Sequence, residues 1–288
     1  MPELPEVETI KRDLEKTILG KKIIGVYVHN PKVIREPAPA AFKKFLEGQT
    51  IKNILRRAKL LILELSNGSA LTIHLKMSGQ LVLRQKTLGT NSRVAFHLSS
   101  GETLDFNDQR LFGELRLLDD WKKLKFVQAL GPEPFDLTFS DFKDMLSKRK
   151  TKIKPLLMDQ SFISGIGNLY AAEILFWAKI NPQRSAQSLT KEEKEILYKE
   201  IKEVLSDAIK HGGSSVDDYV RVSGKNGDYS RFHQVYGRAD KSCFVCGNPI
   251  KRITQAGRGT YFCAKCQPLA PGKSIKLTKK EPLTEETP

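Results

Sequence analysis

The sequence predicts an α+β protein: an N-terminal helix plus a β-sandwich domain, then a helical domain that ends in a cysteine-framed β-hairpin. Three observations carry this prediction. Apolar residues recur at helical spacing near the N-terminus, short alternating segments follow up to about residue 118, and four cysteines cluster near the C-terminus. With 288 residues, the chain is long enough for two domains with their own cores.

The first element is an amphipathic helix over about residues 5 to 19. Its apolar positions share one face: Val7, Ile10, Leu14 and Ile18. Gly20 can end the helix, and Glu3 lies at its mouth, where unpaired amide donors favour negative charge. The opening MPELPEVETI, with two prolines and three carboxylates, serves either helix initiation alone or a chemical site at the terminus.

Eight short strands are expected next, and their number predicts a sandwich or barrel. They cover residues 22–30, 51–57, 60–65, 70–75, 80–84, 93–98, 103–107 and 113–118. Pro132 and Pro134 then interrupt the chain, so the first domain is predicted to span residues 1–131.

The second predicted domain, residues 132–236, is helical. One helix follows Ser140 as its N-cap, and a long helix begins with a Thr190–Glu193 capping box. Between them, residues 153–182 contain two helical stretches joined by a GIGN turn. A long loop rich in Gly, Ser, Asp and Asn, at 212–232, is predicted to be functional or disordered.

The four cysteines form two C-x2-C pairs separated by sixteen residues: Cys243, Cys246, Cys263 and Cys266. Such clustering favours metal binding over disulfides and predicts one tetrahedral zinc ion. Four thiolates leave no open coordination position, so the zinc should be structural. The finger is predicted at 237–267, and a disordered tail at 268–288. Arg258, at the hairpin tip, is interpreted as a phosphate contact or as an ordinary exposed turn residue.

Charge indicates the kind of partner. There are 48 Lys and Arg residues against 33 Asp and Glu residues, a formal net charge of +15, which favours nucleic acid over an anionic membrane. No apolar run approaches the roughly 20 residues that span a bilayer, and no lipidation motif occurs. The N-terminus does not resemble a signal peptide, so a cytoplasmic or nucleoid location is expected.

Two further groups of residues are candidate DNA contacts. The GIGN turn places Asn168 at a helix N-terminus that could bind an anion, downstream of Arg149 and Lys154; an ordinary capped helix beside a solvated face is the alternative. Met77 and the pair Arg110 and Phe112 lie near turns. Met77 and Phe112 either belong to the core or act as apolar wedges, beside Arg110, that fill the space left by an extruded base.

Taken together, these motifs resemble bacterial formamidopyrimidine-DNA glycosylase, an oxidised-purine DNA glycosylase and AP lyase. The stretches that carry the resemblance are MPELPEVETI, RRAKLLIL, HLKMSGQL, DQRLFGEL, the segment 153–176, GG…VYGR and the two cysteine pairs. They occur in that order over almost the whole chain to Cys266. The resemblance implies a β-sandwich, a helix-two-turn-helix domain and a zinc finger.

The resemblance also implies a bifunctional base-excision repair enzyme. It would excise 8-oxoguanine and formamidopyrimidines, then cleave the abasic strand by β,δ-elimination. Pro2 would be the nucleophile after removal of Met1, Glu3 the general acid and base, and Glu6 an orienting residue or lesion contact. Lys59 and Arg258 would contact phosphate and assist elimination.

The implied DNA partner is a duplex with an oxidised base, bound by a monomer. Its implied contacts are Met77, Arg110, Phe112, Arg149, Lys154, Asn168 and Tyr236. A lesion-capping loop would lie at about 217–230. The chain departs from the family at Asn91, where many members have a DNA-contacting histidine, and in the tail beyond the finger.

Two other interpretations compete with this one. A relative of the endonuclease VIII kind would prefer oxidised pyrimidines, but the PELPEVE start and the full-length loop disfavour it. A non-catalytic zinc-ribbon DNA-binding protein would explain the charge and the cysteines equally well. Such a protein would have no need of Pro2 and Glu3 together.

Overall fold

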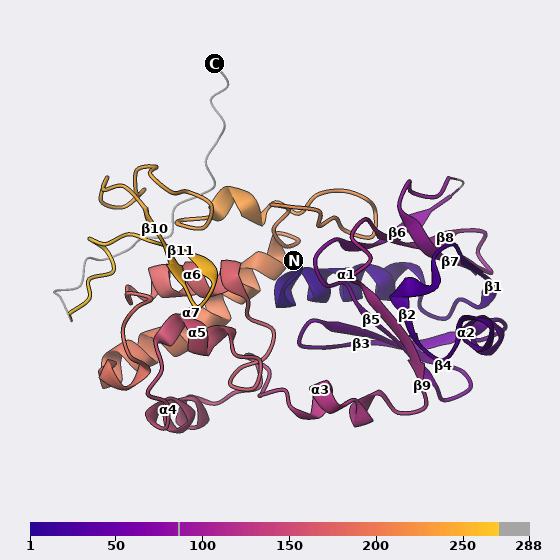
Figure 1. Cartoon of the computed structure of the whole chain (residues 1–288), viewed down its shortest axis with the longest axis horizontal. Coiled ribbons are helices and arrows are strands. Elements are labelled where there is room, and N and C mark those ends of the chain that lie inside the picture. The colour runs from indigo at the N-terminus through magenta and orange to yellow at the C-terminus, as the bar shows by residue number, and fades with distance from the viewer. Residues whose placement is uncertain (86, 271–288) are drawn as a thin grey trace, which may run out of the picture. The chain divides into compact units, whose positions relative to one another are not determined.

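The computed structural model describes residues 1–85 and 87–270. Contacts divide the described residues into two compact units (Figure 1): Met1–Ala129 with Ala208–Asp228, and Leu130–Asp207 with residues 229–270. The predicted α+β class is confirmed, as is the order of helix, sandwich, helical domain and hairpin. No helix among the described residues is both long and apolar enough to cross a membrane.

The first unit begins with α1 (Leu4–Thr17), which packs against the strands of a two-sheet sandwich. The described strands are β1 (Ile23–Val28), β2 (Ile34–Glu36), β3 (Ile51–Arg57), β4 (Leu60–Leu65), β5 (Ala70–His74), β6 (Gly79–Arg84), β7 (Ser92–Leu98), β8 (Thr103–Asp108) and β9 (Glu114–Leu118). One sheet has the order β1-β7-β8-β6 and the other β2-β9-β5-β4-β3. Apolar residues of α1 and of both sheets form one core.

Two elements of this unit, β2 and α2 (Pro39–Leu46), were not predicted from the sequence. Strand β2 has three residues and pairs in parallel with β9, so its conformation depends on a distant partner. Helix α2 is short and buries only Phe42 and Leu46, too few positions for a clear helical period. The unit also contains short helical turns at η1 (Pro31–Val33), η2 (Trp121–Lys123) and α3 (Lys125–Gln128).

The second unit is helical. It contains α4 (Phe139–Ser147), α5 (Ile153–Met158), α6 (Asn168–Trp177), η3 (Ala186–Ser188), η4 (Tyr229–Phe232) and most of α7 (Lys191–Lys210). The predicted capping box of α7 is present, with Glu193 N donating to Thr190 Oγ1 and Thr190 N donating to Glu193 Oε2. The N-cap of α4 is Thr138 and not Ser140, because the Thr138 hydroxyl accepts the Asp141 amide.

Strands β10 (Lys251–Gln255) and β11 (Arg258–Phe262) form the predicted hairpin between the cysteine pairs. The long loop after α7 is not a disordered excursion. Residues up to Asp228 belong to the first unit, and Tyr219 and Val222 are part of its core. The predicted tail at 268–288 lies outside the described residues from position 271 onward.

Candidate active site and metal centre

The N-terminal residues form a compact, buried arrangement at the mouth of α1. Pro2, Glu3 and Glu6 are buried. Glu3 and Glu6 form a reciprocal capping box, in which Glu6 Oε2 accepts the Glu3 amide at 2.8 Å. The other oxygen, Glu6 Oε1, accepts the Ser214 amide at 2.9 Å. Both oxygens of Glu6 are therefore used to fix backbone, which holds Glu3 in place beside Pro2.

A glycine permits the approach of Ser214 to Glu6. Gly213 has a φ of +79°, and a Cβ atom there would lie 3.0 Å from Glu6 Cγ and Oε1. Any larger residue would combine left-handed backbone strain with a steric conflict at the carboxylate. The chain after α7 is thus shaped to reach the N-terminal site.

Lys59 lies in the turn between β3 and β4, beside Ala58, which has a φ of 53°. The Arg56 guanidinium stabilises this turn by donating to Ala58 O at 3.0 Å and to Glu8 Oε2 at 2.9 Å. Burial alone would raise the pKa of Glu8, but hydrogen bonds from Arg56 and Arg12 hold that pKa below its usual value. Glu8 on α1 and Arg56 on β3 thus orient the Lys59 turn. The sequence prediction missed both, although both belong to its motif stretches.

Met77, Arg110 and Phe112 lie on two loops of the first unit. The side chains of Met77 and Phe112 are 40% and 48% exposed, so the alternative that they are core residues is wrong. The Arg110 guanidinium lies 4.9 Å from the centre of the Phe112 ring. This geometry presents two apolar side chains and one stacked cation to the solvent.

A buried carboxylate joins these two loops. Asp108 Oδ1 accepts the Ser78 hydroxyl at 2.5 Å and the Arg110 amide at 3.2 Å, while Oδ2 accepts the Gly113 amide at 2.7 Å. Asp108 therefore holds the Ser78 side chain, next to Met77, and the backbone amides of Arg110 and Gly113 on either side of Phe112. Sequence reasoning did not find it, because its role depends on contacts between separate loops.

The turn before Met77 depends on a neutral histidine. His74 Nδ1 accepts the amide of Lys76, which has a φ of 54°. Burial, together with the nearby charge of Lys76, lowers the pKa of His74 to about 3. In the unfolded chain a histidine takes up its proton near pH 6.5, so the unfolded state is favoured as the pH falls below that value.

We therefore expect the free energy of unfolding to decrease below pH 6.5, by up to about 1.4 kcal/mol per pH unit for each such histidine. His74→Asn keeps a short acceptor but cannot titrate, and should remove part of this slope. Burial also lowers the pKa of His233, so part of the slope should remain. Urea denaturation at pH 7.5 and pH 5 measures the slope, with the exposed His29→Asn as the matched control. Equal slopes for wild type and His74→Asn would contradict the assignment.

Asn91 occupies the position at which the family resemblance predicts a DNA-contacting histidine. Its Oδ1 accepts Arg93 Nη2 at 3.1 Å, and Arg93 Nε donates to Asp108 O at 2.8 Å. The asparagine thus helps to hold an arginine at this position of the sandwich.

In the second unit, Lys154 and Asn168 form one network with the hairpin. Lys154 is only 1% exposed, and its Nζ donates to Asn168 Oδ1 at 2.5 Å and to Thr260 Oγ1 at 2.9 Å. Asn168, the first residue of α6, donates through Nδ2 to Gly259 O at 3.1 Å. The two side chains therefore fasten β11 to α5 and α6.

Arg149 and Arg258 are exposed cations of the same unit. The hairpin turn consists of Ala256 and Gly257, both with positive φ, and Arg258 pairs with Gln255 as the first residue of β11. Arg258 therefore lies next to the hairpin turn and not within it. Its backbone is fixed by the pairing of β10 with β11.

Tyr236 is positioned by a buried carboxylate that sequence reasoning missed. Glu173 is buried on α6 and accepts the amides of Gln234, Val235 and Tyr236 at 2.8 to 3.0 Å. A charged residue inside the apolar run NLYAAEILFW was the available signal, because buried carboxylates require such donors.

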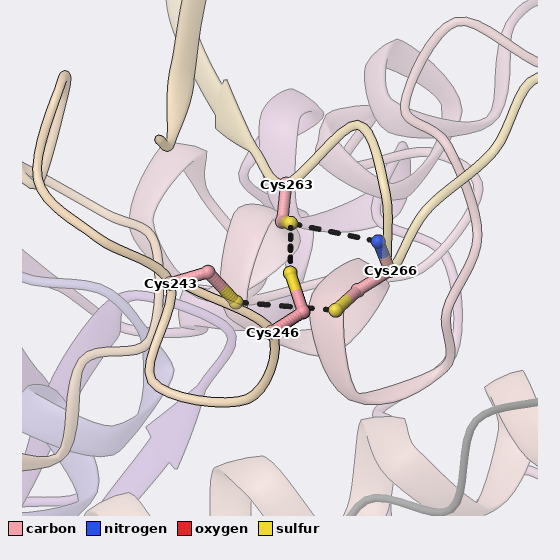
Figure 2. A group of neighbouring side chains, drawn as sticks. All are labelled: Cys243, Cys246, Cys263 and Cys266. Carbon is pink, nitrogen blue, oxygen red and sulfur yellow. Dashed lines mark hydrogen bonds between the residues drawn. The ribbon is translucent and has the colours of Figure 1, made fainter. Parts of the chain in front are cut away.

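The four cysteines converge as predicted (Figure 2). Their sulfur atoms all lie within 4.8 Å of one another, with 3.9 Å between Cys243 and Cys266 and 3.4 Å between Cys246 and Cys263. Tetrahedral zinc–thiolate bonds of about 2.3 Å place sulfur atoms about 3.8 Å apart, so the cluster fits one zinc ion. Apolar side chains of α6 pack around it. The arrangement is that of a closed structural site.

Three family models match the chain. Residues 1–115 match the formamidopyrimidine-DNA glycosylase N-terminal domain, and residues 130–220 match the H2TH domain of the same enzyme. Residues 241–269 match the zinc finger found in FPG and IleRS.

Curated relatives are similar over nearly the full chain. Formamidopyrimidine-DNA glycosylase from Desulforamulus reducens is 44% identical over 274 residues, covering 93% of this chain and 99% of the relative. The protein of that name from Bacillus cereus is 39% identical with the same coverage.

Solved structures are similar as well. A point mutant of Lactococcus lactis FPG in complex with Fapy-dG-containing DNA has a TM-score of 0.86 at 36% identity, covering 93% of this chain and 100% of that one. The MutM (FPG) protein from Thermus thermophilus has a TM-score of 0.83 at 38% identity, covering 94% and 100%.

Proposed function

The chain belongs to the formamidopyrimidine-DNA glycosylase family of zinc-finger DNA repair enzymes, and from this we propose that it excises oxidised purines and then cleaves the abasic strand. The observation that carries the proposal is the buried Pro2–Glu3 pair, held by Glu6 at the mouth of α1. The proposed substrates are 8-oxoguanine and formamidopyrimidines in duplex DNA. A similar solved structure holds DNA containing Fapy-dG, which supports this substrate class.

Pro2 is the proposed nucleophile, through the amine that removal of Met1 exposes. An α-amino group has a pKa of about 8, against about 10.4 for lysine, so more of it is unprotonated at neutral pH. Its nitrogen attacks C1′ of the sugar and loses its proton, and the oxidised base departs with its bonding pair and takes up a proton. The bond between C1′ and the ring oxygen then breaks as that oxygen is protonated, which leaves a C1′–nitrogen iminium. The resulting iminium withdraws electrons from the sugar. Loss of the C2′ proton then expels the 3′ phosphate, and a second elimination expels the 5′ phosphate.

Glu3 is the proposed general acid and base. Its carboxyl group would protonate the sugar ring oxygen as the ring opens, and would accept protons in later steps. Glu6 orients Glu3 through the capping box. Lys59 and Arg258 are proposed to contact phosphate and to assist the β- and δ-eliminations, respectively.

The remaining proposed residues bind DNA. Exposed Met77 and Phe112 would fill the space left by the extruded nucleotide, with Arg110 facing the unpaired base. Arg149, Asn168 and Tyr236 would contact the backbone, and Lys154 would contribute by holding Asn168 and the hairpin. We propose residues 1–131, 132–236 and 237–267 as the catalytic, helix-two-turn-helix and finger domains, with Ala208–Asp228 returning to pack on the first of them. Because all proposed site residues belong to one chain, a monomer acting at the bacterial nucleoid would suffice.

Borohydride reduction in the presence of an 8-oxoguanine duplex tests this proposal. We expect a covalent protein–DNA adduct whose mass corresponds to the chain without Met1 and whose DNA attachment maps to Pro2. An undamaged duplex should give no adduct, and a duplex with an oxidised pyrimidine should give less. An adduct that retains Met1, or that maps to a lysine, would refute the nucleophile assignment.

A further inference from the structure

The segment 212–228 is held on the first unit at several points along its length. Ser214 N donates to Glu6, and Leu83 N, on the edge strand β6, donates to Val222 O at 2.8 Å. Tyr219 is buried and donates its hydroxyl to Gly212 O at 2.9 Å. A segment almost without regular secondary structure is thus anchored to both a helix and a sheet edge.

One ion pair stands out among these anchors. Arg221 donates to both oxygens of Asp13 on α1, with Nε to Oδ2 at 3.0 Å and Nη2 to Oδ1 at 2.6 Å. This bidentate geometry is the strongest form of arginine–carboxylate pairing. Arg221 remains 40% exposed, so the pair is accessible to salt.

The backbone of Arg221 also closes a tight turn. Its amide donates to Lys225 O at 2.8 Å, and its carbonyl accepts the Gly224 amide at 2.8 Å. Gly224 has a φ of +79°, which the turn requires. The Asp13 contact therefore fixes a complete turn, residues 221–225, relative to α1.

The same segment reaches the proposed catalytic terminus. Glu6 binds Ser214 through one oxygen and Glu3 through the other. A displacement of the segment would therefore change the surroundings of Pro2 and Glu3.

We propose that Asp13 and Arg221 are positioning residues that hold the segment 212–228 beside the N-terminal site before DNA binds, and that this selectively assists substrates still carrying a damaged base. This inference rests on the proposed glycosylase function. Ordering a loop costs conformational entropy, and an anchor already present in the free protein removes that cost from the substrate-binding step. A base must be enclosed for excision, whereas an abasic sugar presents no base to enclose.

The test compares two reactions of the same protein. Arg221→Gln and Asp13→Asn should lower kcat/KM for 8-oxoguanine excision about three- to tenfold, in line with loss of a partly exposed charge-assisted pair. Strand cleavage at a preformed abasic site should stay within about twofold of wild type. Lys225→Gln, which removes an exposed charge from the same turn, is the matched control and should leave the ratio of the two rates unchanged.

A charge swap separates positioning from simple destabilisation. Asp13→Arg combined with Arg221→Asp should recover most of the excision rate that either single swap loses. Raising the salt concentration should lower the ratio of excision to abasic cleavage in wild type more than in Arg221→Gln. Equal loss of both reactions in Arg221→Gln, or no loss of either, would overturn the inference. Absence of excision by the wild type would instead refute the proposed function.

Discussion

Glu3→Gln is expected to reduce base excision by about two to four orders of magnitude while duplex affinity stays close to wild type. General acid and base catalysis contributes a factor of this size, and a glutamine cannot supply the proton. The amide oxygen can still accept a backbone hydrogen bond, so the capping box with Glu6 and the start of α1 should persist. Single-turnover excision of 8-oxoguanine and fluorescence anisotropy of the same duplex measure the two quantities.

The matched control for this variant lies on the same helix. Glu15→Gln makes the same chemical change further along α1, at a side chain that pairs only with Lys11 among its described ion-pair partners. It should excise at the wild-type rate. Retention of excision by Glu3→Gln would refute the acid–base role, and loss of duplex binding would show that the carboxylate acts through the fold.

Removal of zinc is expected to weaken binding of lesion-containing duplex by at least about tenfold. The four cysteines are part of the core that the hairpin shares with α6, where they pack against residues such as Phe176 and Tyr261. Without the ion, four neighbouring thiols replace four zinc–thiolate bonds, and the hairpin that carries Arg258 keeps only its other contacts, such as those of Lys154 and Asn168. Anisotropy titrations before and after chelation measure the change, and added zinc should restore the affinity.

The covalent step should respond differently. At saturating DNA, the metal-free protein should still form the borohydride-trapped adduct, since the Pro2 amine belongs to the first unit. A folded, metal-free protein with unchanged affinity would show that the finger is not a DNA-binding element. The replacement Cys246→Ser offers an independent route to the same comparison.

Local patterns predicted the elements whose sequence period is clear. Helix α1 shows four apolar residues at helical spacing, and most strands show alternating or continuous apolar runs bounded by turn residues. Strand β2 and helix α2 lack such a period, since one has three residues and the other buries two side chains. The cysteine spacing predicted the metal cluster because two C-x2-C turns bring four sulfurs together almost regardless of the surrounding fold.

The roles of individual charged residues could not be predicted from local sequence patterns. Lys152 and Lys154 belong to one basic run, yet Lys152 is exposed and Lys154 is enclosed by Asn168 and the hairpin. Likewise Asp108 accepts the hydroxyl of Ser78, 30 positions away, and Glu173 accepts the amide of Val235, 62 positions away. Contacts between residues far apart in the sequence produce no periodic sequence pattern. For this reason the sequence alone could not distinguish charged side chains that orient other groups from those that are exposed to solvent.

The hydrogen bond between Glu6 and the Ser214 amide joins residues that are 208 positions apart. During synthesis, the N-terminal end leaves the ribosome first, but the second anchor of Glu6 is made only after the ribosome has added residue 214. Since protein chains emerge sequentially and fold as their parts become available, the arrangement around Pro2 is completed only after residue 214 has been synthesised. A chain truncated before residue 214 would carry Pro2, the proposed nucleophile, without one of the two partners that hold Glu6, and we expect such a chain not to excise damaged bases.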